Sequence, residues 1–179
     1  YDKYINSNKF FKKASKIVPL ASQTFSKSFQ QYSKGVAPLF VDNGKGALVK
    51  DIDGNEYIDY VMGLLPIVLG YCDPDVDNQI IKQINKGITF SLATKLEYEL
   101  SKKLIRLIPS AEMVRFGKNG SDATSAAIRL ARAYTKRDKI AVAGYHGWHD
   151  WYIGSTTRDL GVPKSVKELT YKFSLNNLN

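Results

Sequence analysis

The residues best suited to chemistry lie in a turn at positions 116–123, with the sequence Phe-Gly-Lys-Asn-Gly-Ser-Asp-Ala. Its two glycines allow positive φ and a close approach of the backbone to a ligand. The turn leads into an alanine-rich stretch, residues 123–134, whose apolar positions recur at the three-and-four spacing of a helix with one buried face. Unpaired amides at the start of a helix attract anions, and we expect Ser121 or Asp122 to cap this one. The pattern predicts an anion site that suits a phosphate group.

A tight connection between a strand and a helix, without any ligand, is the alternative interpretation of this turn. Residues 113–116, just before it, are expected to end a short apolar strand. The turn is not a P-loop, because Lys118 precedes the second glycine instead of following it, and the chain has no Gly-x-Gly-x-x-Gly fingerprint. We therefore expect the anion to belong to something other than a mononucleotide triphosphate.

A second group of functional side chains follows at residues 144–150, with the sequence Gly-Tyr-His-Gly-Trp-His-Asp, which contains both histidines of the chain. The short apolar run before it, residues 140–143, is expected to be a buried strand. Consecutive parallel strands of an α/β sheet bring their carboxyl ends to one edge, where ligands bind. We therefore expect Tyr145 to emerge beside Gly120 and Ser121.

Three interpretations of this aromatic loop are open. A metal site would use His146, His149 and Asp150, but the histidines are three apart on a loop interrupted by glycine and no cysteine assists them, so we expect no metal. The aromatic residues could instead cover an edge of the core. They could also form a platform that stacks on a planar cofactor whose phosphate lies on the neighbouring helix.

Several stretches, taken in their order along the chain, together resemble a known protein family. They are residues 49–60, 70–76, 119–124, 127–140 and 144–147. In sequence and spacing they resemble the class III pyridoxal-phosphate aminotransferases, and within these the branch of glutamate-1-semialdehyde 2,1-aminomutase. The resemblance implies an α/β fold, with an N-terminal segment and the first part of the large doubly wound domain of a fold-type I transferase. Residues 1–70 would form the N-terminal segment and residues 71–179 part of the cofactor domain.

The resemblance implies pyridoxal 5'-phosphate as the cofactor. It places the phosphate on the backbone amides of Gly120 and Ser121 and on the Ser121 hydroxyl, with Asn119 beside it where the family often has serine. Tyr145 would stack on the pyridine ring. The Schiff-base lysine is expected beyond Asn179, so we expect no catalytic residue in this chain, which would be an inactive N-terminal fragment of an aminotransferase or aminomutase.

The resemblance also points to substrate contacts near the start of the chain. Residues 24–27, Thr-Phe-Ser-Lys, align with a Ser-Pro-Val-Arg stretch whose arginine pairs with a substrate carboxylate in the aminomutases. Thr24 and Lys27 are therefore candidate substrate residues. Lys27 keeps the positive charge but lacks the planar fork of arginine, so we expect a small amine or carbonyl substrate other than glutamate semialdehyde to be at least as suitable.

Composition narrows the classes of partner. The chain has 26 basic and 17 acidic residues, for a net charge of +9, but its lysines are dispersed along solvated faces and carry no nucleic-acid motif. The longest apolar run, residues 61–69, is about half of a ~20-residue membrane span. We expect neither nucleic acid nor membrane as a partner.

Cys72 is the lone cysteine, which suits a cytoplasmic protein. The family resemblance implies a homodimer when complete; the alternative function is a non-catalytic α/β ligand-binding or interaction domain.

Periodicity and turn residues predict the other elements. Helices are expected near residues 9–17, 74–86, 96–107 and 123–134, and strands at residues 39–41, 47–49, 57–59, 113–116 and 140–143. Asp53-Gly54 is expected to be a hairpin turn. Residues 162–179 show no strong pattern.

Overall fold

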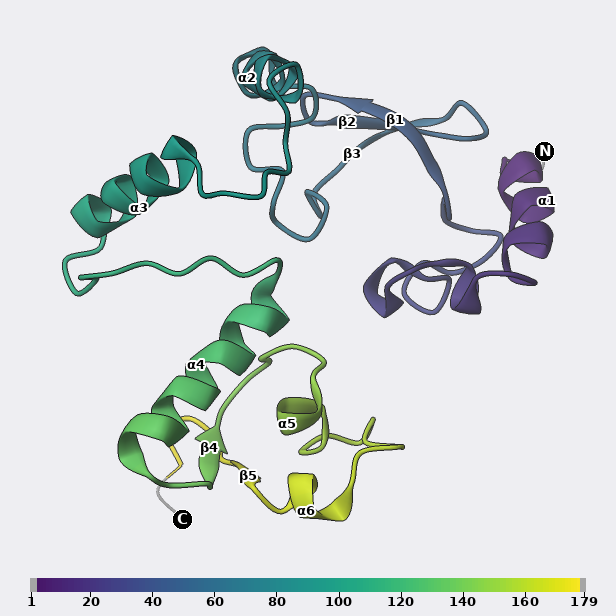
Figure 1. Cartoon of the computed structure of the whole chain (residues 1–179). Coiled ribbons are helices and arrows are strands. Elements are labelled where there is room, and N and C mark those ends of the chain that lie inside the picture. The colour runs from purple at the N-terminus through teal and green to yellow at the C-terminus, as the bar shows by residue number, and fades with distance from the viewer. Residues whose placement is uncertain (1–2, 178–179) are drawn as a thin grey trace. The chain divides into compact units, whose positions relative to one another are not determined.

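The computed structural model describes residues 3–177. Its chain forms two compact units, Tyr1–Ser91 and Leu92–Asn179 (Figure 1). The division into residues 1–70 and 71–179 concerns domains of a complete enzyme and stays a prediction. No helix among residues 3–177 is both long enough and apolar enough to cross a membrane.

The first unit joins helices to a small antiparallel sheet. Its elements are α1 (Ile5–Ala14), the 3-10 turns η1 (Pro19–Ala21) and η2 (Phe25–Lys27), β1 (Val41–Lys45), β2 (Leu48–Asp51), β3 (Glu56–Ile58) and α2 (Pro74–Ile84). The sheet has the order β1-β2-β3, with Val49 opposite Gly44 on one side and Tyr57 on the other. The strands expected at residues 47–49 and 57–59 are confirmed as β2 and β3, whereas β1 begins at Val41, the last residue of the strand expected at 39–41. Gly54, at φ +86°, lies in the turn between β2 and β3 as predicted.

The turn between β2 and β3 also holds α1 in place. Asp53 accepts hydrogen bonds from the backbone amides of Asn6 (2.6 Å) and Ser7 (2.9 Å), at the first turn of the helix. Tyr4 at the N-cap makes no side-chain capping bond of its own. These two hydrogen bonds tie the first turn of α1 to the β2–β3 hairpin.

A tyrosine–carboxylate pair fixes the chain after β3. The Tyr71 hydroxyl donates to Asp59 Oδ2 at 2.6 Å, and Asp59 Oδ1 accepts from the amides of Val61 (2.9 Å) and Met62 (3.1 Å). The hydrogen bond from Tyr71 lowers the pKa of Asp59 below its usual range. The same bond, together with burial, raises the pKa of Tyr71 to about 12.

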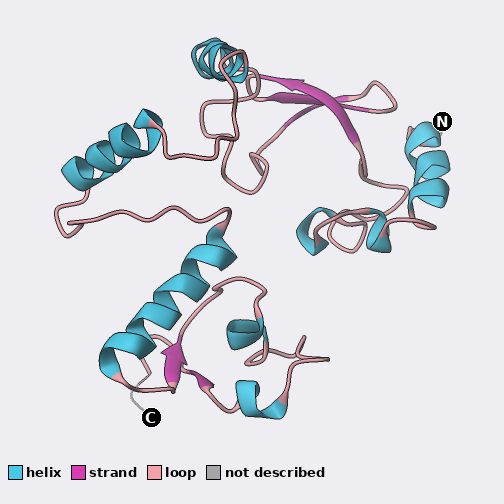
Figure 2. Cartoon of the chain, in the orientation of Figure 1, coloured by secondary structure: helices cyan, strands magenta, loops and turns pink. Residues whose placement is uncertain are grey.

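The second unit contains a parallel strand pair with helices around it (Figure 2). Its elements are α3 (Lys95–Leu107), α4 (Gly120–Thr135), β4 (Ile140–Val142), α5 (Asp150–Ile153), α6 (Lys164–Lys167) and β5 (Thr170–Lys172). β4 and β5 pair in parallel, with Ile140 opposite Thr170, and the connection between them contains α5 and α6. A parallel pair with a helical connection is the unit from which doubly wound sheets are built. Its small core includes Val142, Tyr152 and Val162.

Two sequence expectations for this unit are corrected by the structure. Residues 113–116 form no strand, because no described strand lies alongside them to complete a ladder, and Met113 is 91% exposed. Conversely, α6 and β5 occupy the stretch that shows no pattern. α6 has only four residues and β5 only three, and such short elements show no recognisable hydrophobic period.

Candidate functional site

The anion site predicted from the sequence corresponds to the N-terminus of α4. Asn119 has extended backbone angles, and its Oδ1 accepts from the Asp122 amide at 3.0 Å, so Asn119 is the cap. The expectation that Ser121 or Asp122 caps the helix is wrong, since both residues already lie inside the helix. Among the described contacts, the amides of Gly120 and Ser121 have no acceptor. They remain available to an anion at the positive end of a 16-residue helix.

The backbone at this helix start is open to a ligand on one side and packed on the other. A Cβ added to Gly120 would meet no atom within 4 Å, so its amide can be approached closely. Ser121 is only 9% exposed, and its Oγ accepts from the amide of Trp148 at 3.3 Å. The Ser121 hydroxyl therefore lies at the boundary between the helix and the aromatic loop.

The aromatic loop presents one tyrosine and anchors its neighbours. The Tyr145 side chain is 76% exposed and packs edge-to-face on Tyr152, with ring centroids 5.7 Å apart. The Tyr152 hydroxyl donates to the carbonyl of Gly144 at 2.8 Å. His146 Nε2 lies 2.7 Å from the carbonyl of Ala143, so this nitrogen carries a proton and donates. His146 thus orders the loop, while the Tyr145 ring stays free to contact a ligand.

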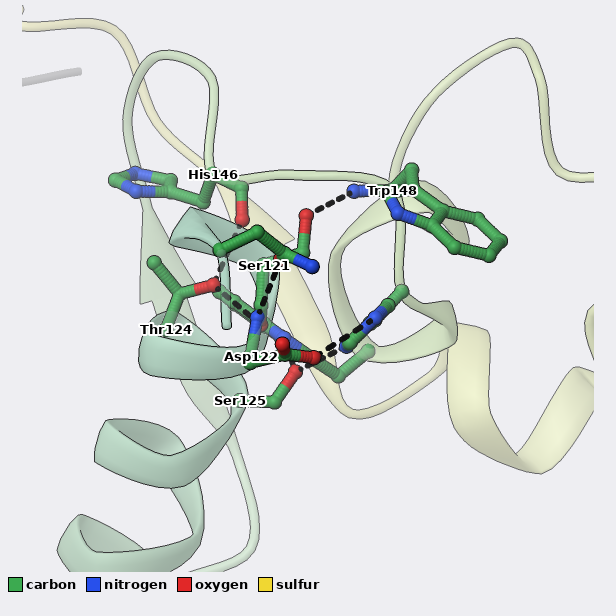
Figure 3. A network of polar contacts seen from close by, with 9 residues as sticks. Ser121, Asp122, Thr124, Ser125, His146 and Trp148 are labelled. Atoms are coloured by element: carbon green, nitrogen blue, oxygen red, sulfur yellow. Dashed lines mark hydrogen bonds and ion pairs between the residues drawn. The ribbon is translucent and has the colours of Figure 1, made fainter. Parts of the chain in front are cut away.

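Three contacts fasten the loop to the first turns of α4 (Figure 3). Thr124 Oγ1 lies 3.0 Å from the carbonyl of His146 and 3.1 Å from that of Ser121. Trp148 donates its amide to Ser121, as described above. Gly147, at φ +109°, passes so close to Ser121 that an added Cβ would overlap the serine hydroxyl. The loop therefore cannot shift away from the helix start without breaking these bonds.

The helix start and the loop border an open hollow of about 460 Å³, lined by residues 119–121, Thr124 and residues 145–148. The structure thus brings Tyr145 to the same hollow as Gly120 and Ser121, as the sequence predicted. The predicted reason was partly wrong, because residues 113–116 form no strand. The loop is instead held by side chains of α4.

Farther along α4, a chain of polar contacts reaches the end of the loop. Trp151 Nε1 donates to Ser125 Oγ at 3.0 Å, and Ser125 Oγ lies 2.7 Å from His149 Nδ1. His149 Nε2 in turn lies 3.9 Å from Asp122 Oδ1. Sequence reasoning missed this set because Ser125 is separated from its two partners by more than 20 residues. The spacing of Ser121, Asp122 and Ser125 on one helix was the available signal.

Comparison with known proteins identifies the family. Residues 29–179 match the family model described as "Aminotransferase class-III". The chain belongs to the class-III aminotransferases. It is 43% identical over 178 residues to a 3-aminobutyryl-CoA aminotransferase of Cloacimonas acidaminovorans, covering 99% of this chain and 42% of that protein. It is 45% identical over 167 residues to a glutamate-1-semialdehyde 2,1-aminomutase of Listeria innocua, covering 90% and 38%.

Solved structures agree with this assignment. An omega-transaminase from Sphaerobacter thermophilus matches 96% of this chain and 42% of its own, with TM-score 0.84 and 29% identity. A structure described as a transaminase with PLP bound matches the same shares, with TM-score 0.85 and 29% identity. The predicted α/β fold of a fold-type I transferase is confirmed. This class-III aminotransferase chain spans about two fifths of the length of these relatives.

The remaining candidate residues of the class-III aminotransferase chain lie apart from this hollow in sequence. Thr24 and Lys27 belong to the first unit, at and within η2, where the Thr24 amide donates to Ser22 Oγ at 3.3 Å. Their contact with a substrate stays a prediction. Residues 3–177 contain no group of three or more His, Cys, Asp or Glu side chains placed to bind a metal ion.

Proposed function

We propose that this chain provides the phosphate-binding and ring-binding part of a pyridoxal-phosphate-dependent aminotransferase or aminomutase. One observation carries the proposal: the unpaired amides at the start of α4 and the exposed Tyr145 ring line a single hollow. Membership of the class-III aminotransferases and likeness to a transaminase with PLP bound support it. A plain strand-to-helix connection would not require both features together.

The donors at the helix start fit a phosphate group. The Gly120 and Ser121 amides can each donate a hydrogen bond, and the Ser121 hydroxyl adds a third donor. The positive end of α4 favours a dianion at this place. Asn119 uses its Oδ1 as the helix cap, which leaves its Nδ2 group to donate toward the hollow that it lines. We therefore assign these three residues to the phosphate.

The aromatic loop fits a planar ring beside that phosphate. The Tyr145 ring is exposed, and its contact with Tyr152 fixes its orientation without covering it. Stacking of aromatic rings is worth about 0.5–1.5 kcal/mol beyond the burial of area. Thr124 and Gly147 keep the loop at a constant distance from the helix start, so that ring and phosphate are held at the same time.

These residues bind and orient; they do not make or break bonds. Pyridoxal phosphate, when bound, supplies an electron sink for negative charge that develops next to the substrate amine. The lysine that would hold the cofactor covalently is expected beyond Asn179. Within the described chain, we assign Gly120 and Ser121 to neutralising phosphate charge and Tyr145 to covering one face of the ring.

The finer functional assignments are also proposals. We infer a small amine or carbonyl substrate, contacted by Thr24 and Lys27. The single charge of Lys27 can attract a carboxylate but cannot grip it in two places as arginine does. The family and the dispersed positive charge support a cytoplasmic homodimer that binds neither nucleic acid nor membrane. Sedimentation of the natural protein measures its subunit number.

Titration of the natural protein that contains this chain with pyridoxal phosphate tests the proposal. We expect saturable binding with a visible absorption band, and transfer of an amino group from an amine to a carbonyl compound. Tyr145→Ala should weaken binding about tenfold, because the stacked ring is lost. Tyr145→Phe is the matched control and should stay within about twofold, since it keeps the ring.

A folded wild-type protein that does not bind pyridoxal phosphate would refute the proposal. Binding without any amino transfer would favour the alternative, a non-catalytic ligand-binding domain. Equal affinities of the Tyr145→Ala and Tyr145→Phe variants for pyridoxal phosphate would show that the Tyr145 ring does not contact the cofactor.

A further inference from the structure

The first turn of α4 carries a carboxylate directly beside the proposed phosphate site. Asp122 follows Ser121 in the chain, yet its side chain does not line the hollow. A carboxylate that turned toward a bound phosphate would repel it, because both groups are negative. The structure therefore has to keep Asp122 outside the hollow if an anion is to bind well.

One contact holds the Asp122 side chain beside the end of the aromatic loop. Its Oδ1 lies 3.9 Å from His149 Nε2, and both side chains are about one third exposed. There is little free space between Asp122 and Gly117, since a Cβ added at Gly117 would lie 3.3 Å from Asp122 Cβ. In Figure 3, Asp122 and Ser125 lie together on the first turns of α4. The carboxylate thus faces the imidazole.

The hydrogen bonds around Ser125 are compatible with an imidazole form that carries its proton toward Asp122. The indole nitrogen of Trp151 can only donate, so Ser125 Oγ is its acceptor. The Ser125 hydroxyl keeps its own proton, and His149 Nδ1 lies 2.7 Å from Ser125 Oγ. When Ser125 donates this proton to Nδ1, the neutral ring carries its proton on Nε2, the nitrogen that faces the Asp122 carboxylate.

We propose that His149 is a positioning residue that keeps the Asp122 carboxylate away from the phosphate site, with Ser125 and Trp151 fixing its ring. The inference rests on the proposed function, because it concerns the affinity for the cofactor phosphate. His149, Ser125 and Trp151 would thus influence cofactor affinity although they bind neither the cofactor nor the substrate. It also explains why an acidic residue is tolerated next to the anion site.

The test measures the affinity of the natural protein for pyridoxal phosphate and, separately, for inorganic phosphate. His149→Ala should weaken both about fivefold, because the released carboxylate approaches the anion in a partly solvated site. Asp122→Asn should stay within about twofold of the wild type, since its charge is already held away. The double variant His149→Ala/Asp122→Asn should return to within about twofold.

Recovery in the double variant separates positioning from packing. If His149 only fills space, removing the Asp122 charge would not restore affinity, and the inference is overturned. Unchanged affinity in His149→Ala would overturn it as well. Should His149→Ala fail to fold, Ser125→Ala replaces it in the test. This variant keeps the imidazole but removes its hydrogen bond to Ser125, and recovery of affinity on adding Asp122→Asn is again the result that supports positioning.

The two ligands distinguish the inference from the proposed function. Wild-type protein that binds inorganic phosphate but not pyridoxal phosphate refutes the cofactor assignment alone, and the variants are then compared on inorganic phosphate. Wild-type protein that binds neither overturns both. Imidazole nitrogen resonances add a readout that is independent of binding: we expect an Nε2-protonated ring in the wild type and a loss of this preference in Ser125→Ala.

Discussion

Gly147→Ala is the substitution that most directly tests how the aromatic loop meets α4. Gly147 has φ +109°, and a Cβ there would overlap the hydroxyl of Ser121 and lie 3.0 Å from its Cβ. Gly144, in the same loop, has φ +81° but nothing within 4 Å of an added Cβ. The two glycines therefore share the backbone requirement and differ in available space.

The structure gives a magnitude for each substitution. Alanine at positive φ costs about 1–2 kcal/mol, which is all that Gly144→Ala should lose. The overlap with Ser121 adds about 1–3 kcal/mol to Gly147→Ala, because a well-packed contact must be pushed apart. The displaced Ser121 hydroxyl and amide would also donate less well to a phosphate, and we expect the affinity for pyridoxal phosphate to fall about tenfold in Gly147→Ala alone.

Denaturant unfolding of the wild type and the two variants, followed by cofactor titration, measures both effects. The informative quantity is the difference between the two alanine variants, since both lose stability through positive φ and only Gly147→Ala adds the overlap with Ser121. If Gly147→Ala and Gly144→Ala unfold with the same free energy and bind the cofactor equally well, Gly147 does not pack on Ser121 and the described geometry of the hollow is wrong.

Two further predictions concern stability. Asn119→Ala should lower the free energy of unfolding by about 1 kcal/mol, because α4 loses its cap on the Asp122 amide, whereas Asn119→Ser should retain most of it; chemical denaturation compares the two. Tyr71→Phe should cost about 1 kcal/mol at neutral pH, since the bond to the Asp59 carboxylate is lost. On the alkaline side, this wild-type advantage should be fully present up to pH 10.0, the ordinary pKa of tyrosine, and disappear as pH rises toward about 12, the folded value. It should also decline in acid, as pH falls below 3.8 through the lowered pKa of Asp59, and unfolding measured across pH would contradict the pair if both proteins responded identically.

The sequence predicted those features that local pattern determines. The 3.6-residue period of the apolar residues predicted α4, and the Asp53-Gly54 turn predicted the pairing of β2 and β3. The approach of Tyr145 to Gly120 was also foreseen, because glycines and an aromatic residue after a buried strand indicate a ligand edge. Local pattern was sufficient for α4 and the hairpin, whereas the prediction for Tyr145 also assumed a strand at residues 113–116 that is not formed.

Features that depend on distant partners were not predictable in this way. The expected strand at residues 113–116 has the right residue types, but a strand exists only when another strand completes its ladder. β5 shows the converse, since three unremarkable residues become a strand by pairing with β4. The bond between Ser125 and His149 likewise spans 24 residues and leaves no periodic signal. The cap was missed for a different reason: Asn119, Ser121 and Asp122 are all good capping residues, and only the backbone angles distinguish them.

The contact between Asp53 and α1 has a consequence for the order of folding. A helix of ten residues is marginal by itself, because nucleation costs more than so few hydrogen bonds return. The acceptor for its first amides arrives 46 and 47 residues later in the chain, in a hairpin turn that forms from neighbouring residues. The hairpin can therefore close without the helix, but α1 gains its cap only afterwards. α1 is synthesised before the hairpin that caps it, so the order of synthesis and the order of stabilisation are opposite for these two elements.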